Sequence, residues 1–468
     1  MASLTINSST TVFPSHPTPA AALSLSENDQ FRAWTHVPTV YIYKSPAAAA
    51  TAAVLGSLKN SLSQILVPYY PLAGRLRLIA GGRLELDCCA AGATLMEASS
   101  TAKLDDYGDF APSDALRRLA PNVDYDNSPI EEVPMLLVQV TRFSCGGLVV
   151  GVTFSHTLVD GASAITFINS WASMARGEKT VDSIPQPFHD RKFLQPQKPV
   201  PPPRFHHGEY DEPPLLHGYS NAEEEEKKES VCALLKLTKE QVEKLKKRAN
   251  SNQPNPNTTN QNMAMLDHEL QPRPYSRYES ITGYMWLCAC KARNNAESRQ
   301  PTVVRIIVDI SRRLRTPIPE NFTGNSCLIT ITPQCKFGDL MTQPLSYAVG
   351  KIREGTWKMT DEYAKSAMDF LARKEDITWA RTLHHSIVRV KGSFWGNPNL
   401  ALGSWMSMPL YDADFGWGRP SYVGPAMVNS DGKAYIMSGP TNDGSVIIAI
   451  RLQTKHMDDF KKFFYEDL

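Results

Sequence analysis

Residues 148–161 read LVVGVTFSHTLVDG, an apolar run that leads to His156 and is followed by Asp160. The β-branched residues of 148–154 predict a strand, and the apolar positions return at helical spacing after residue 161. His156 is therefore expected between a strand and a helix, where an imidazole can remove a proton from a nucleophile. Asp160 is expected to cap the helix. The pair alone also fits a buried core histidine beside a capping aspartate. Other segments of the chain are needed to distinguish the two interpretations.

The same alternation of strands and helices extends in both directions. Residues 136–143 and 148–154 form a predicted hairpin, and Gly81-Gly82 marks a second turn between short strands at 76–78 and 84–87. Thr238 and Gln241 have the spacing of a capping box at a helix start. The other strands are predicted at 37–43, 231–237, 303–308 and 445–452, and the other helices at 47–66, 281–292 and 455–465. The pattern is that of an α/β protein.

The length of 468 residues, 42% of them hydrophobic, is too great for one ordinary core and predicts two domains of roughly 200 residues. Residues 185–214 are rich in proline, and an acidic run follows at 223–226. Such a segment is not expected to build a core, and a charge run is expected to be solvated. We therefore expect domains at 1–190 and 229–468, joined by a linker at 191–228.

Composition excludes several classes of protein. A net charge of +1 gives no general attraction for nucleic acid or an anionic membrane, and no apolar run approaches the roughly 18 residues of a membrane span. The eight cysteines lack CxxC spacing and are expected to be reduced thiols. No Lys or Arg precedes Arg32, which argues against a targeting peptide. A cytoplasmic protein is expected.

The sequence also lacks the motifs of several common enzymes. It contains no GxSxG elbow and no Walker-type phosphate loop, which argues against a serine hydrolase and a nucleotide-binding enzyme. The pairs His206-His207 and His384-His385 have no Cys or carboxylate at ligand spacing, so no metal is expected.

Three segments that occur in this order support a functional role for His156: YPLAGRL at 70–76, HTLVDG at 156–161 and DADFGWG at 412–418. Together they resemble the plant BAHD acyltransferases along essentially the whole chain, and NFTGN at 321–325 resembles the family's YFGN segment. The resemblance implies an α/β fold with two chloramphenicol-acetyltransferase-like domains, mixed sheets flanked by helices, and an active-site channel at their interface. It also implies a monomer that uses acyl-CoA as a co-substrate and holds no permanent cofactor.

By the same resemblance, His156 is the general base, and Asp160 is structural and pairs with an arginine. Ser311 replaces one arginine of the family segment, which leaves Arg313 as the expected partner and Arg312 as its rival. Asp414, Gly416 and Trp417 are expected to be structural, with Asp414 and Trp417 able to help shape the channel. The residues expected to bind CoA are Ser276, Arg277, Tyr278, Phe322 and Gly324. For Arg277, a solvated surface position is an equal alternative.

The resemblance also bears on the identity of the acceptor. Shikimate and quinate acyltransferases of the family hold the acid with a Thr and an Arg; here the Thr is Gly403, and the Arg aligns only with a gap, at Arg389. Residues 35–41, 205–216 and 392–399 instead resemble spermidine hydroxycinnamoyl transferases. The acceptor pocket is then expected to include Thr39, Tyr41 and Trp405.

We therefore expect transfer of a hydroxycinnamoyl group from hydroxycinnamoyl-CoA to an amine of spermidine or a related polyamine, a step of phenolamide formation. A polyamine must lose a proton first, because alkylamines have pKa values of roughly 10. One alternative is an O-acyltransferase for shikimate, quinate or another alcohol. Others are a non-catalytic relative that binds small molecules and a hydrolase in which His156 activates water.

Overall fold

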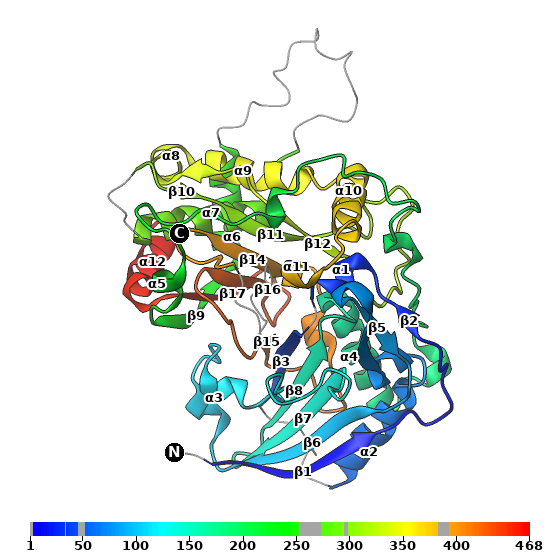
Figure 1. Ribbon diagram of the computed structural model, residues 1–468. Helices are drawn as coiled ribbons and strands as arrows, with labels where there is room; N and C mark the ends of the chain where they lie inside the picture. Colours follow the sequence, from blue (N-terminus) through cyan, green and yellow to red (C-terminus); the bar gives the residue numbers. More distant parts are fainter. Residues whose placement is uncertain (1–2, 33, 45–51, 252–272, 294–297, 382–392) are drawn as a thin grey trace.

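Two six-stranded mixed sheets organise the molecule, one in each half of Figure 1. The computed structural model describes residues 3–32, 34–44, 52–251, 273–293, 298–381 and 393–468. The first sheet has the order β1-β6-β7-β8-β3-β15, in which β6 and β7 are parallel and the other neighbours antiparallel. Its strands are β1 (Leu4–Val12), β6 (Ala93–Ser100), β7 (Leu136–Phe143), β8 (Leu148–Ser155), β3 (His36–Tyr43) and β15 (Tyr422–Pro425).

The hairpin of β7 and β8 lies inside this sheet, and every residue of β8 is buried. The helix α4 (Gly161–Ala175) follows β8 and packs against α2 (Ala52–Ile65). Trp171 of α4 is fully buried, and its indole N–H donates to the Leu58 carbonyl and to the hydroxyl of Ser61. An apolar strand on one side and a packed helix on the other hold the loop of His156 between two rigid elements.

The second sheet has the order β12-β11-β14-β16-β17-β9, with β14 parallel to both of its neighbours. The predicted capping box at Thr238 and Gln241 is present at the start of α6. The strands are β12 (Cys327–Ile331), β11 (Val304–Asp309), β14 (Leu400–Trp405), β16 (Lys433–Ser438), β17 (Val446–Gln453) and β9 (Ser230–Leu237). The helices packed together in this half are α6 (Lys239–Asn250), α7 (Arg277–Arg293), α9 (Leu345–Trp357) and α12 (Thr454–Glu466).

Smaller elements complete the fold. The predicted turn at Gly81 and Gly82 joins β4 to β5, and both glycines have positive φ. The short strands are β2 (Leu23–Ser24), β4 (Arg75–Leu78), β5 (Leu84–Asp87), β10 (Pro301–Thr302) and β13 (Cys335–Lys336). The remaining helices are α1 (Glu27–Gln30), α3 (Asp114–Arg117), α5 (Glu223–Glu226), α8 (Phe337–Thr342), α10 (Asp361–Ala372) and α11 (Thr378–Arg381). The 3-10 turns are η1 (Tyr70–Ala73), η2 (Ala80–Gly82), η3 (Leu104–Tyr107), η4 (Val181–Ser183), η5 (Lys192–Leu194), η6 (Gly208–Tyr210) and η9 (Leu410–Asp412).

The chain crosses back to the first sheet late in the sequence, which corrects the expected domain at 229–468. Strand β15 pairs antiparallel with β3, so that Tyr422 lies opposite Ile42 and Pro425 opposite Thr39. The side chains of Tyr411 and Phe415 also pack in the hydrophobic core beside this first sheet. Figure 1 shows β15 beside β3, between the two halves. The segment from β14 to β16 therefore ties the halves together.

The linker is also more structured than expected. Leu194 and Tyr210 are buried in the second core, and Glu225 in the acidic run is only 2% exposed. Glu225 accepts hydrogen bonds from Lys228, from Asn397 at 2.9 Å and from Gln453 at 2.7 Å. The expectation of a solvated run is thus wrong for this glutamate, because three donors replace its water.

Two expected absences concern the described residues alone. Within the described ranges, no helix is long and apolar enough to cross a membrane. The same residues contain no group of three or more His, Cys, Asp or Glu side chains arranged to hold a metal ion.

Candidate active site

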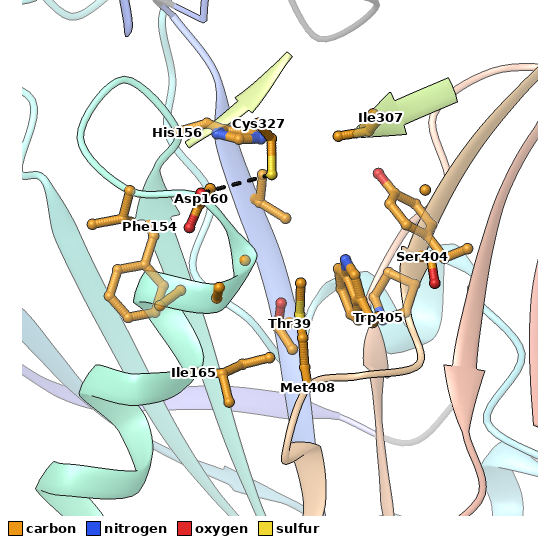
Figure 2. Close-up of a pocket in the computed structure, with 18 of the residues that line it drawn as sticks. Thr39, Phe154, His156, Asp160, Ile165, Ile307, Cys327, Ser404, Trp405 and Met408 are labelled. Carbon is orange, nitrogen blue, oxygen red and sulfur yellow. Dashed lines mark hydrogen bonds between the residues drawn. The ribbon is translucent and has the colours of Figure 1, made fainter. Parts of the chain in front are cut away.

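A cavity of about 350 Å³ lies between the two sheets, with His156 on its wall. One side is formed by β3, the end of β8 and the start of α4, and the other by β11, β12, β14 and β16. In Figure 2, His156 and Asp160 lie across the open space from Ser404 and Trp405. The backbone N–H of His156 donates to the Thr35 carbonyl at 2.8 Å, which extends the strand pairing as far as the histidine.

Asn325 fixes the state of the His156 ring. Its amide nitrogen donates to Asp29 at 2.7 Å and to the His156 carbonyl at 2.9 Å, so its oxygen faces His156 Nδ1, 3.2 Å away. Nδ1 must then carry the proton and donate, which leaves the lone pair on Nε2. Burial, and next the charge of Arg32, lower the pKa of His156 to about 3. At neutral pH the ring is an unprotonated base.

Asp160 supports this loop through hydrogen bonds to both halves of the molecule. One carboxylate oxygen accepts from the Ser163 N–H at 3.0 Å and caps α4, as predicted. The other accepts from the Ser326 N–H at 2.9 Å and its hydroxyl at 3.0 Å, and a dashed line in Figure 2 marks its contact with Cys327. Both oxygens are engaged, so Asp160 is a structural residue even though it borders the cavity.

The expected partnership of Asp160 with an arginine is wrong in detail. Arg313 donates to the carbonyls of Thr356 and Met359, and Arg312 donates to Glu320 on the surface. Backbone and hydroxyl donors already satisfy the lone pairs of Asp160, so that neither guanidinium is required as a partner. The charge of Asp160 does act on the buried Arg32, whose pKa is lowered by burial against the opposing effect of acids that include Asp160.

The DFGWG segment is structural and stands apart from the cavity. Asp414 accepts from the N–H groups of Gly416, Trp417 and Gly418 at 2.8–3.1 Å. Gly416 has a φ of 97°, a conformation that glycine adopts without strain. Trp417 packs edge-on against Tyr43 of β3. Asp414 and Trp417 do not line the cavity, and their contribution to its shape stays a prediction.

The three residues expected at the acceptor pocket all line the cavity. Thr39 and Tyr41 come from β3, and Trp405 comes from the end of β14. Gly403 lines it as well, and a Cβ there would lie 3.1 Å from the Tyr435 ring. Arg389 lies outside the described residues.

The five residues expected to bind CoA divide into two groups, neither of which lines the cavity. At the start of α7, the Ser276 hydroxyl accepts from the Glu279 N–H, and Arg277 donates to the Gly444 carbonyl at 3.4 Å, while Tyr278 is half-buried. The Gly324 carbonyl instead accepts from the Asp160 N–H, and that of Phe322 from Ser163. Their role in CoA binding stays a prediction.

Sequence reasoning missed two residues that matter at the site. Asn325 is the last residue of the NFTGN segment. The resemblance of this segment to the family led to predictions for Phe322 and Gly324 but not for Asn325. Lys433, on β16, carries no motif at all, and only the pairing of β16 with β14 brings it to the cavity.

The arrangement supplies a neutral base in a confined space that residues of both halves enclose. Such a base can take a proton from an acceptor as the acceptor attacks a carbonyl. This is the chemistry of acyl transfer.

Comparison with known proteins agrees with this chemistry. A family model described as the transferase family matches residues 2–467. Hydroxycinnamoyl-CoA:piscidic acid hydroxycinnamoyltransferase of Actaea racemosa is 44% identical over 465 residues, 99% of either chain. Shikimate O-hydroxycinnamoyltransferase of Nicotiana tabacum is 38% identical over 463 residues, 98% of this chain and 99% of its own. The solved structure of vinorine synthase has a TM-score of 0.70 at 22% identity, with 98% of this chain and 96% of that chain covered.

The likeness to solved structures confirms the predicted fold class of two chloramphenicol-acetyltransferase-like units with mixed sheets. The family match and the relatives cover essentially the whole chain. The chain belongs to the transferase family of BAHD acyltransferases and is an enzyme that uses acyl-CoA as its co-substrate.

Proposed function

We propose that this enzyme transfers a hydroxycinnamoyl group from its CoA thioester to a hydroxyl group of a small acceptor. The observation that carries the proposal is the buried, unprotonated His156, held by Asn325 on the wall of a cavity that both halves enclose. The relatives at 44% and 38% identity are named for hydroxycinnamoyl transfer, which supports this donor class. Both walls come from one chain, so the proposal needs no second copy.

In the proposed reaction, His156 Nε2 takes the acceptor's hydroxyl proton while the oxygen attacks the thioester carbonyl. The tetrahedral intermediate then collapses and breaks the C–S bond. The departing thiolate takes the proton from the imidazolium, which releases CoA thiol and the ester and restores the neutral base. His156 holds a proton only transiently, which suits an imidazole whose pKa burial lowers.

The charges of the lining argue against spermidine, the acceptor that the sequence favours. A polyamine carries several positive charges, which need carboxylates or aromatic faces in a confined site. Among the described lining residues, the carboxylates are Asp160 and Asp309, and Asp309 already accepts from the Ser311 N–H. The cations are Arg32, Arg305 and Lys433. The aromatic faces of Trp405 and Tyr435 keep spermidine as the second candidate.

Product identification tests the proposal. The purified protein is incubated with p-coumaroyl-CoA, caffeoyl-CoA or feruloyl-CoA and with shikimate, quinate, piscidic acid or spermidine, and thiol release and product mass are measured. We expect an ester on at least one hydroxy acid and a much lower rate with spermidine. Amide formed on spermidine alone would overturn the proposed acceptor.

Two further outcomes would overturn the proposal more deeply. Consumption of the thioester at the same rate without any acceptor would identify a hydrolase. Saturable CoA binding without thiol release from any donor would identify a non-catalytic relative.

A further inference from the structure

Lys433 is a cation of the cavity wall for which the described part of the chain supplies no counter-ion. It is half-buried at the start of β16, and none of the described residues forms an ion pair with its ammonium group. Its Nζ lies 5.5 Å from the centre of the Tyr435 ring. Arg32, by contrast, donates at 2.6–2.7 Å to Asn28 and Cys327, and Arg305 lies over the Trp395 ring. Lys433 is thus the lining cation with the least competition for an incoming anion.

The register of the second sheet places a trough beside this lysine. Ala401 of β14 lies between Arg305 of β11 and Lys433 of β16, and Gly403 lies opposite Tyr435. Neighbouring strands are about 4.8 Å apart, so the two cationic residues flank the small alanine across roughly 10 Å. A Cβ on Gly403 would meet Tyr435 at 3.1 Å and Ile307 at 3.8 Å. The Tyr435 ring therefore fills the space beside the buried Gly403, whereas the half-buried Ala401 presents only a methyl group to the cavity.

The trough and the catalytic base share one cavity. Lys433, Gly403 and His156 all line it, and the positive charge of Lys433 is close enough to lower the pKa of His156 further, after burial and Arg32. An acceptor over Ala401 could therefore reach the base and the ammonium group at once. A bound anion would satisfy Lys433, whereas a second cation beside it would be repelled.

We infer that Lys433 binds a carboxylate of the acceptor and that Ala401 forms the floor beside it on which the acceptor lies. This inference rests on the proposed function and makes the acceptor a hydroxy acid. The ammonium group fixes one end of the acceptor, so that a hydroxyl group at the other end meets His156. Lys433 is accordingly a specificity-determining residue, and the base remains His156.

The test compares three variants with the wild-type enzyme. Lys433→Met keeps the length of the side chain and removes its charge, Lys433→Arg keeps the charge, and Lys433→Glu reverses it. Each is assayed with the hydroxy acid that the wild type esterifies fastest and with the methyl ester of that acid, and thermal melting confirms that each variant is folded.

Loss of the charge should lower kcat/KM for the acid about 10- to 100-fold, the usual effect of losing a hydrogen bond to a charged group. Lys433→Glu should lower it further, and Lys433→Arg should retain most of it. With the methyl ester, Lys433→Met should differ little from the wild type, and the KM for the CoA thioester should not change.

Three results would overturn the inference. Equal losses with the acid and its methyl ester would assign Lys433 a merely structural role. A rise confined to the KM of the CoA thioester would identify a CoA phosphate as the anion. Unchanged kinetics in Lys433→Met would remove the lysine from the site. In each of these cases the wild type would still form an ester, whereas failure of the proposed function would appear as no ester at all.

Discussion

At the scale of single residues, the site depends on how His156 is held. Asn325 fixes the ring through Nδ1, and Asp160 fixes the loop that follows. Of these two residues, only Asn325 contacts the imidazole, and it selects the tautomer. Asp160 positions the backbone. The sequence motif shows His156 and Asp160 together, but the direct partner of the ring is 169 residues away.

The low pKa of His156 predicts an unusual pH profile. A histidine with the ordinary pKa of about 6.5 would be protonated, and inactive as a base, below that pH. Burial lowers the pKa of His156 to about 3, so the free enzyme should keep its neutral base as the pH falls through 6.5. We expect kcat/KM to show no loss with a midpoint near 6.5, as measured between pH 5 and 8 on enzyme shown to be folded by circular dichroism. An acidic limb centred near 6.5 would contradict this burial effect.

Replacement of Asp160 by Ala should act mainly through stability. The variant loses a helix cap of about 1 kcal/mol and leaves the buried Ser326 N–H unpaired at about 1–3 kcal/mol, or about 3 kcal/mol together. Urea denaturation measures the free energy of unfolding. Asp105→Ala removes an exposed carboxylate paired with Lys44 and should change it by less than about 1 kcal/mol. Equal stability of the two variants would argue against the structural role.

At the scale of elements, local patterns predicted what local interactions determine. The strand β8, the helix α4 and the capping box at Thr238 were predictable because hydrophobic period and cap residues lie within a few positions of one another. Strand β15 was not predictable, because it has only four residues and ends in a proline, and its pairing partner β3 is nearly the whole chain away. The return of the chain to the first sheet depends on tertiary contacts, and no local sequence pattern predicts it.

The acidic run offers a test of the linker. Glu225 is buried and bonded to Asn397 and Gln453, whereas Glu224 beside it is exposed. Glu225→Ala should lower the free energy of unfolding by about 3 kcal/mol, because its buried partners lose their acceptor. Glu224→Ala should change it by less than about 0.5 kcal/mol. Denaturation curves that coincide for the two variants would show that the run is solvated throughout.

At the scale of the whole molecule, several histidines whose pKa values are lowered in the folded chain make the fold sensitive to acid. Burial lowers the pKa of His36, His189 and His456 to about 4 and that of His156 to about 3. In the unfolded chain these groups bind protons below about pH 6.5, while in the folded chain they remain neutral, so stability falls as the pH drops from about 6.5 towards 4. Each can contribute up to about 1.4 kcal/mol per pH unit in that window.

Denaturation at pH 7, 6 and 5 measures this loss. His189→Gln should reduce the slope, since one buried titrating group is removed and an amide can still donate to the Pro68 carbonyl. His206→Gln is the matched control, because His206 is 81% exposed and should leave the slope nearly unchanged. A stability that does not depend on pH over this range would contradict the burial of neutral imidazoles.

The sequence predicts the family and the two-sheet fold, but the acceptor pocket much less well. The three motifs are short local segments, and their order along the chain is visible without a structure. Recognition of the acceptor depends on side chains from different strands that meet only after the sheet forms, such as Lys433 and Gly403. Lys433 belongs to no motif, and Gly403 was interpreted only as the loss of the Thr that holds an acid in relatives, so the sequence favoured a polyamine where we propose a hydroxy acid.

The central claim is that His156 is the general base of acyl transfer. Its most direct test is the turnover number of His156→Ala with a hydroxycinnamoyl-CoA donor and the preferred acceptor, alongside calorimetric CoA binding as a check on the fold. We predict a fall in kcat of about 10²- to 10⁴-fold, the usual contribution of a positioned base, with CoA affinity close to that of the wild type. Turnover near the wild-type rate would contradict the claim.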